Sequence, residues 1–205
     1  MAIALYTDGG LLGRNPTRQA ITWAWCRVES GEIVAERCGW IRASELPIRP
    51  DVGWPEGTNN QAEYYAILDG LEHLGDTEHV TVWTDSRVAY GWWTDSRSSL
   101  RSIPADWRIR QNRQLRRRGA VTAWQHLHGH PIQRKLAEQK ERASRGEDIS
   151  QDGYSEYNVY VDGLCRSMTA LAELALLSER EFGTMRGGEM SSQDDISHTN
   201  EHGRY

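Results

Sequence analysis

The stretch that decides the fold is residues 2–10, which reads AIALYTDGG. Its short apolar run predicts a buried strand that ends at Asp8, a carboxylate placed where the apolar pattern breaks. Two later stretches also place an acid where the backbone pattern breaks. In residues 58–63 (TNNQAE), Glu63 is expected on the inward face of a helix, and in residues 79–86 (HVTVWTDS) a strand ends at Asp85. Acids placed in this way predict a metal site.

Length and composition predict one globular domain. The chain has 205 residues, which fits a single core. No run approaches the roughly 18 apolar residues of a membrane span, and the first thirty residues do not resemble a signal peptide. We expect a cytoplasmic location and a monomer. Cys26, Cys38 and Cys165 form no C-x-x-C pair, which favours buried thiols over a disulfide framework or a zinc site.

Charge is unevenly distributed along the chain. A net charge of -5 argues weakly against a nucleic-acid partner. Residues 101–118, however, hold seven arginines against one acid, Asp106. This segment predicts a local positive patch that could hold phosphates. A solvated helix face is the alternative interpretation of the same residues.

The first half predicts three strands, a loop and a helix. Residues 2–8, 21–28 and 32–41 are expected to form an antiparallel meander, and the prolines and glycines of residues 43–57 predict a loop. Thr58 and Gln61 form a capping box for a helix that begins there. Glu63 falls on the apolar stripe of this helix with Ile67 and Leu74, where an unpaired carboxylate is costly to bury. The alternative is a partly exposed Glu63 that interacts with the helix dipole.

A five-residue repeat, WTDSR, offers two candidates for the third acid. It occurs at residues 83–87 and again at residues 93–97. Asp85 follows a predicted strand, and ligands bind at the carboxyl edge of such strands. Asp95 follows a predicted helical stretch and is better explained as a helix end or a cap. We therefore assign Asp85 to the site.

The second half predicts a basic helix at residues 104–118, a fifth strand at 120–127 and a last helix from Asn158 that carries Asp162 beside its apolar stripe. Residues 132–156 predict an exposed helix followed by a flexible loop. Residues 183–205 lack periodicity and predict a disordered tail. His126, His128 and His130 alternate, but a zinc site would lack a fourth ligand.

Together these residues resemble the type 1 ribonuclease H family. The resemblance rests on residues 7–10 (TDGG), 58–63 (TNNQAE), 84–86 (TDS), 129–130 (GH), and Asn158 with Asp162 four residues later, and it covers about residues 1–175 in the family order. It implies an α/β, ribonuclease H-like fold: a five-stranded mixed sheet, three antiparallel strands then two parallel, flanked by helices. The implied catalytic domain is residues 1–182, with an insertion at 132–157.

The resemblance also implies an activity, which is hydrolysis of the RNA strand of an RNA/DNA hybrid to leave 5'-phosphate and 3'-hydroxyl ends. Asp8, Glu63, Asp85 and Asp162 would hold two Mg²⁺ ions, with Mn²⁺ as a substitute. Asp8 would bridge both ions, and Glu63 and Asp85 would complete the attacking side. Asp162 would complete the other side, and His130 would assist leaving-group protonation or product release. The insertion leaves Asp152 as an alternative to Asp162.

The implied substrate contacts come from glycine backbone, amides and arginines. They are Gly9, Gly10, Asn59, Asn60, Gln61, Ser86, Arg87, Arg116, Arg117 and Arg118. Arg87 stands where the family commonly has a polar amide, and the 101–118 segment is short for the family's basic protrusion. Two other functions stay open: a hybrid- or RNA-binding module that has lost hydrolysis, and a related nuclease such as a resolvase, a transposase or an exonuclease.

Overall fold

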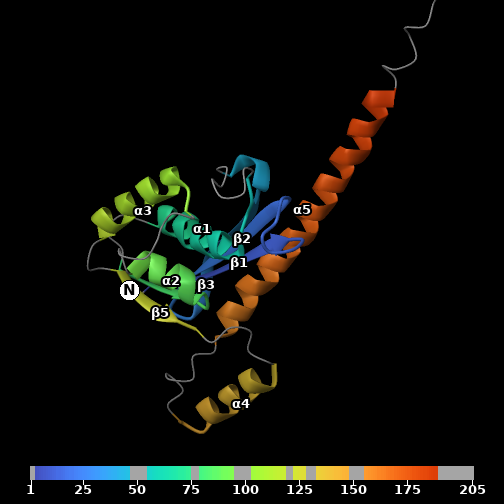
Figure 1. The fold of residues 1–205 in the computed structure, drawn as a ribbon. Coiled ribbons are helices and arrows are strands. Elements are labelled where there is room, and N and C mark those ends of the chain that lie inside the picture. Colours follow the sequence, from blue (N-terminus) through green and yellow to red (C-terminus); the bar gives the residue numbers. More distant parts are fainter. Residues whose placement is uncertain are drawn as a thin grey trace, which may run out of the picture. The chain divides into compact units, whose positions relative to one another are not determined.

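A computed structural model describes residues 3–46, 55–74, 79–94, 103–118, 122–127, 133–147 and 155–188. Its centre is a five-stranded mixed sheet in the order β3-β2-β1-β4-β5 (Figure 1). The strands are β1 (Ile3–Leu12), β2 (Ala20–Glu29), β3 (Glu32–Arg42), β4 (Val80–Thr84) and β5 (Thr122–His126). β1 to β3 pair antiparallel, whereas β4 pairs parallel with both β1 and β5. The predicted fold class is therefore confirmed.

The helices follow the predicted order. They are a short 3-10 helix η1 (Ala43–Glu45), then α1 (Asn59–Glu72), α2 (Arg87–Thr94), α3 (Ala105–Arg118), α4 (Gln133–Ser144) and α5 (Glu156–Gly188). The chain divides into two compact units, residues 1–172 and 173–205, so the first unit contains the sheet and the start of α5. Within the described ranges, no helix is both long and apolar enough to cross a membrane.

Apolar side chains cover both faces of the sheet. On one face Leu5 and Trp25 pack with Tyr64 of α1 and with residues of α2 and α3. On the other face Tyr6 packs with Val161 of α5. Successive side chains of a strand point to opposite faces, so the even-numbered residues of β1, which include Asp8, face α5. This alternation decides where the acid of β1 points.

The first strand is longer than the sequence predicts. We expected it to end at Asp8, but β1 continues to Leu12, and Gly9 and Gly10 pair with Trp23 and Thr22 of β2. The residues after Asp8 are Gly9 and Gly10, and glycine has a low intrinsic preference for strands, so the sequence predicts that the strand ends there. Ladder pairing with β2 overrides this preference. Asp8 consequently sits inside a paired strand, where the backbone is firmly held.

The helix boundaries agree with the sequence to within a few residues. The capping box is confirmed: Thr58 accepts from the backbone of Gln61, whose side chain accepts from the backbone of Thr58. α5 begins two residues before the expected Asn158 and runs to Gly188, past the point where periodicity ends. α4 lies within the predicted insertion. The assignment of residues 1–182 to one catalytic domain and 183–205 to a disordered tail stays a prediction.

Candidate metal and nuclease site

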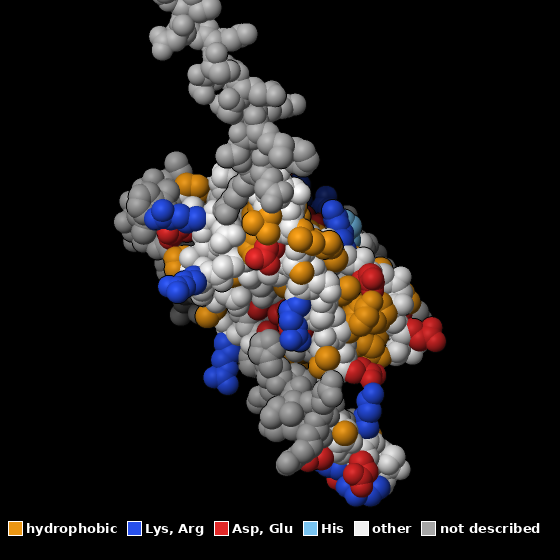
Figure 2. All heavy atoms as spheres, turned by 90° about the vertical axis from the view of Figure 1, so that its right-hand side faces the viewer, with side chains coloured by type: hydrophobic (Ala, Val, Ile, Leu, Met, Phe, Trp, Pro, Cys, Tyr) orange, Lys and Arg blue, Asp and Glu red, His pale blue; other side chains and the backbone are white. Residues whose placement is uncertain are grey.

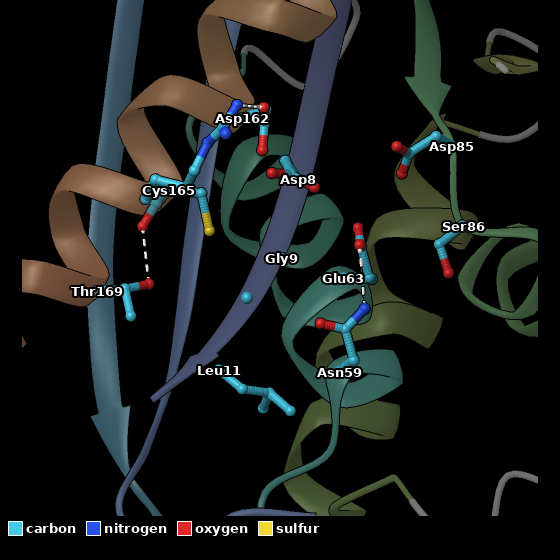
Figure 3. A pocket seen from close by; sticks show the side chains of 12 residues that line it. Asp8, Gly9, Leu11, Asn59, Glu63, Asp85, Ser86, Asp162, Cys165 and Thr169 are labelled. Carbon is cyan, nitrogen blue, oxygen red and sulfur yellow. Dashed lines mark hydrogen bonds and ion pairs between the residues drawn. The ribbon is translucent and has the colours of Figure 1, made fainter. Parts of the chain in front are cut away.

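Three carboxylates meet at the carboxyl edge of the sheet. Asp8 comes from β1, Glu63 from the first turns of α1, and Asp85 directly follows β4. One ligand atom from each lies within 4.8 Å of the others. Asp8 is 7% exposed and Glu63 4%, and both line, with Asp85, a pocket of about 510 Å³ (Figure 3). Burial of Glu63 confirms that it lies on the inward face of its helix.

Gly9 explains how β1 and α1 come close enough to join Asp8 to Glu63. A Cβ on Gly9 would lie 2.2 Å from the backbone nitrogen of Glu63 and 2.4 Å from the carbonyl carbon of Ala62. Only glycine permits this approach. The missing side chain therefore serves contact between the strand and the helix, a reason that the sequence did not reveal.

The fourth acid, Asp162, reaches the same pocket from α5. A polar contact anchors this helix to β2, since the Thr22 hydroxyl lies 2.9 Å from the Thr169 hydroxyl and 3.4 Å from the Cys165 sulfur. Gly10 lies beneath these atoms, and a Cβ there would lie 2.8 Å from the Thr22 hydroxyl. These contacts hold the α5 segment that carries Asp162 against the sheet, and Figure 3 shows Asp162, Cys165 and Thr169 on this helix.

Burial and mutual repulsion raise the pKa values of the inner acids. Desolvation, followed by the charges of Asp85 and Asp162, raises the pKa of Asp8 from 3.8 to about 7. Desolvation, then Asp8 and Asp85, raises the pKa of Glu63 well above its usual value. Asn59 offsets part of this repulsion by donating to Glu63 at 3.5 Å. The cluster therefore requires either protons or cations at neutral pH.

The donor set fits a hard divalent cation. Carboxylate oxygens are the ligands that Mg²⁺ and Mn²⁺ prefer. Glu63 supplies an independent sign, because its buried Oε2 has no hydrogen-bond partner within the described residues. A buried carboxylate oxygen without a donor is costly, and a bound cation would compensate it.

The pocket includes some of the predicted substrate-binding residues and omits others. Gly9, Gly10, Asn59 and Ser86 line it. Three other predicted substrate-binding residues, which are Asn60, Gln61 and Arg87, do not line it. Gln61 is buried and its side-chain oxygen accepts from the backbone of Thr58 at 2.8 Å, so it serves the helix cap.

A second cavity, of about 450 Å³, lies on α3. The described residues that line it are Ile109, Asn112, Arg113, Arg116 and Arg117. Arg118 ends α3, and its side chain lies outside the described residues. Positive charge thus gathers locally on a chain of net charge -5. Figure 2 shows that charged side chains of both signs occur on the face that it draws.

Three predicted or alternative residues lie outside the described ranges: His130, Asp95 and Asp152. Their assignments stay predictions, as does the exclusion of a histidine zinc site. Conversely, the pocket contains residues that the sequence did not single out for the site, namely Leu11, Cys165, Arg166 and Thr169. The i,i+4 spacing of Asp162 and Arg166 predicts that the two side chains can pair, but it does not predict that the pair lines the pocket.

Comparison with solved structures identifies the fold. The N-terminal RNase H domain of a Mycobacterium tuberculosis protein, solved as a fusion with maltose-binding protein, aligns at a TM-score of 0.52 and 16% identity, covering 85% of this chain and 98% of that one. The chain therefore has the ribonuclease H-like fold.

Two structures of LC11-RNase H1 also align. The enzyme isolated from compost by a metagenomic approach gives a TM-score of 0.45 at 22% identity, covering 67% of this chain and 90% of that one. The structure of LC11-RNase H1 in complex with an RNA/DNA hybrid gives a TM-score of 0.44 at 21% identity, covering 66% of this chain and 89% of that one. No protein-family model matches the sequence, and no curated protein matches it.

Proposed function

We propose that this chain is a ribonuclease H, a metal-dependent endonuclease that hydrolyses the RNA strand of RNA/DNA hybrids and leaves 5'-phosphate and 3'-hydroxyl ends. We further expect it to act as a cytoplasmic monomer. The proposal rests on the ribonuclease H-like fold together with the site. The observation that carries it is the convergence of Asp8, Glu63, Asp85 and Asp162 on one pocket from four separate segments of the chain.

The four acids divide naturally into two parts. Asp8, Glu63 and Asp85 would hold one Mg²⁺ ion, and Asp8 with Asp162 would hold a second. Bound divalent ions activate water and neutralise charge in phosphodiester hydrolysis. The protein's own contribution is to fix these carboxylates on paired or packed backbone, so that a phosphate entering the pocket meets an oriented site.

Discrimination for RNA is proposed to come from the mouth of the pocket. The 2'-hydroxyl distinguishes RNA from DNA, and it can both donate and accept a hydrogen bond. Asn59 lines the pocket, and its amide already donates to Glu63, which would link sugar recognition to a catalytic acid. The backbone of Gly9 and Gly10 and the hydroxyl of Ser86 line the same space.

The arginines of α3 are proposed to hold phosphates of the DNA strand. Arg113, Arg116 and Arg117 surround the second cavity, and guanidinium groups bind phosphate oxygens in a bidentate way. Since phosphate contacts position a nucleic acid without reading its sequence, these residues would set affinity and register. His130 is proposed to assist protonation of the leaving oxygen or release of product.

The test compares labelled RNA/DNA hybrid, double-stranded RNA and double-stranded DNA in Mg²⁺ and in EDTA. We expect cleavage of the hybrid alone, only with Mg²⁺, and none by Asp8→Asn or Glu63→Gln. Glu141→Gln is the matched control, because Glu141 lies on α4 outside the pocket, and it should keep wild-type activity. Equal cutting of the duplex controls would refute the hybrid assignment, and binding without cutting would indicate a module that has lost hydrolysis.

A further inference from the structure

Arg166 places a positive charge inside the acidic pocket. It follows Asp162 by one turn of α5, lines the pocket, and forms an ion pair with Asp162. The dashed line at Asp162 in Figure 3 marks this pair. The Arg166 side chain is 73% exposed whereas that of Asp162 is 15% exposed. A solvent-exposed cation therefore pairs with a largely buried acid of the site.

The ion pair makes the two halves of the pocket unequal. Asp8, Glu63 and Asp85 already bring ligand atoms within 4.8 Å of one another, and Asp162 is not part of that group. Glu63 retains a buried oxygen without a partner in the described chain. One cation position is thus preassembled, while the acid of the other position already has a cation from the protein.

We propose that Arg166 is an exchangeable counter-ion of Asp162 that a second divalent cation must displace, so that Arg166 sets the affinity of the second metal position. The inference rests on the metal-binding part of the proposed function and does not require hydrolysis. It assigns to Arg166 a positioning role: the residue controls which partner Asp162 has.

The physical chemistry of the pair supports exchange. The Arg166 side of the pair is exposed, so solvent screens the guanidinium, and an ion pair at i,i+4 spacing also costs both side chains freedom. A guanidinium keeps its charge at any accessible pH, so it can leave only by rotating away. A divalent cation attracts the Asp162 carboxylate more strongly than the singly charged guanidinium of Arg166 does. Competition at Asp162 is consequently expected to weaken the second metal by a modest factor.

The competing explanation is that the pair only stabilises α5. The chain offers a comparison outside the pocket lining: Arg145, the residue directly after α4, pairs with Glu141 of α4 at the same i,i+4 spacing and also with Glu147. If the Arg166 pair were merely structural, replacing either arginine would have the same small effect on helix stability and no effect on metal binding.

The experiment is calorimetric titration of MnCl₂ into the full-length, EDTA-treated protein. Wild type is expected to bind two ions, one more tightly. Arg166→Gln should tighten the weaker site roughly fivefold and change the tighter site less. Arg166→Lys retains the charge and should stay close to wild type, and Arg145→Gln should match wild type. Asp162→Asn should remove the weaker site whether residue 166 is Arg or Gln.

The proposal is overturned if the Mn²⁺ affinity of the weaker site in Arg166→Gln is within twofold of wild type or lower than wild type. It is also overturned if Arg166→Gln raises this affinity by the same factor in a protein that carries Asp162→Asn. It is also overturned if wild type binds no second ion. Circular dichroism of each variant checks folding. Failure of the proposed function is distinguishable, because a protein that binds Mn²⁺ as described but does not cleave hybrid retains this inference and loses only the ribonuclease assignment.

Discussion

Replacing Asp8 by asparagine should stabilise the metal-free protein while it abolishes activity. The pKa of Asp8 rises from 3.8 to about 7 in the folded chain because of burial and the neighbouring charges of Asp85 and Asp162. The folded state therefore holds the Asp8 proton more tightly than the unfolded state does. Stability from this group is complete below pH 3.8 and is lost as the pH rises to 7.

The expected size follows from the same values. One pKa unit corresponds to about 1.4 kcal/mol, and between pH 5 and the folded pKa of about 7 the ionisation penalty grows by roughly 2 to 3 kcal/mol. Asparagine carries no such penalty. The stability advantage of Asp8→Asn over wild type should accordingly grow by about that amount from pH 5 to pH 8.

Urea unfolding followed by circular dichroism, in EDTA at both pH values, measures this difference. Glu141→Gln is the control: Glu141 is exposed, with 69% of its side chain accessible, and the variant should show no comparable dependence on pH. Adding Mg²⁺ should make wild type more stable than Asp8→Asn, because only wild type gains a bound ion. A variant that is less stable than wild type at pH 8, or whose advantage does not change with pH, would refute the reasoning.

Three further predictions concern the backbone, the arginines and the repeated acid. Gly9→Ala should lower activity by about 100-fold, because its Cβ would lie 2.2 Å from the backbone nitrogen of Glu63 and displace α1. Gly91→Ala is the control: its Cβ would meet nothing within 4 Å, so it should be fully active in the same steady-state assay. Replacing both Arg116 and Arg117 by glutamine should weaken hybrid binding and reduce the slope of log K against log salt by about 1 to 2, measured by fluorescence anisotropy; an unchanged slope would show that α3 does not contact phosphates. Asp85→Asn should abolish Mg²⁺-dependent cleavage, whereas the same change at the second copy of the WTDSR repeat should leave it intact, and the reverse outcome would reassign the third acid.

The sheet and the first helix are predictable from the sequence because the apolar strands and the capping box are local signals. The alternation of residues 79–84 and the reciprocal bonds of Thr58 and Gln61 are encoded within a few residues of each other. The extension of β1 to Leu12 was missed, since its stability comes from pairing with β2 and not from the two glycines themselves. Local patterns cannot report a ladder formed with a distant strand.

The site shows the same division. Asp8, Glu63 and Asp85 each sit at a recognisable boundary in the sequence, and the structure brings them together. The contribution of Arg166 depends on which face of α5 meets the sheet, and contacts of Thr22 with Cys165 and Thr169, more than 140 residues apart in the chain, decide that face. Such tertiary contacts have no local signature.

The central claim is that the four acids bind the metal ions that hydrolyse the hybrid. Its most direct test is a crystal structure of wild-type protein with a non-cleavable hybrid and Mn²⁺, in which anomalous scattering locates the ions. Our account predicts one ion between Asp8, Glu63 and Asp85, a second beside Asp162, and an RNA phosphate at the ions. Ions bound elsewhere, or a hybrid bound away from this pocket, would contradict it.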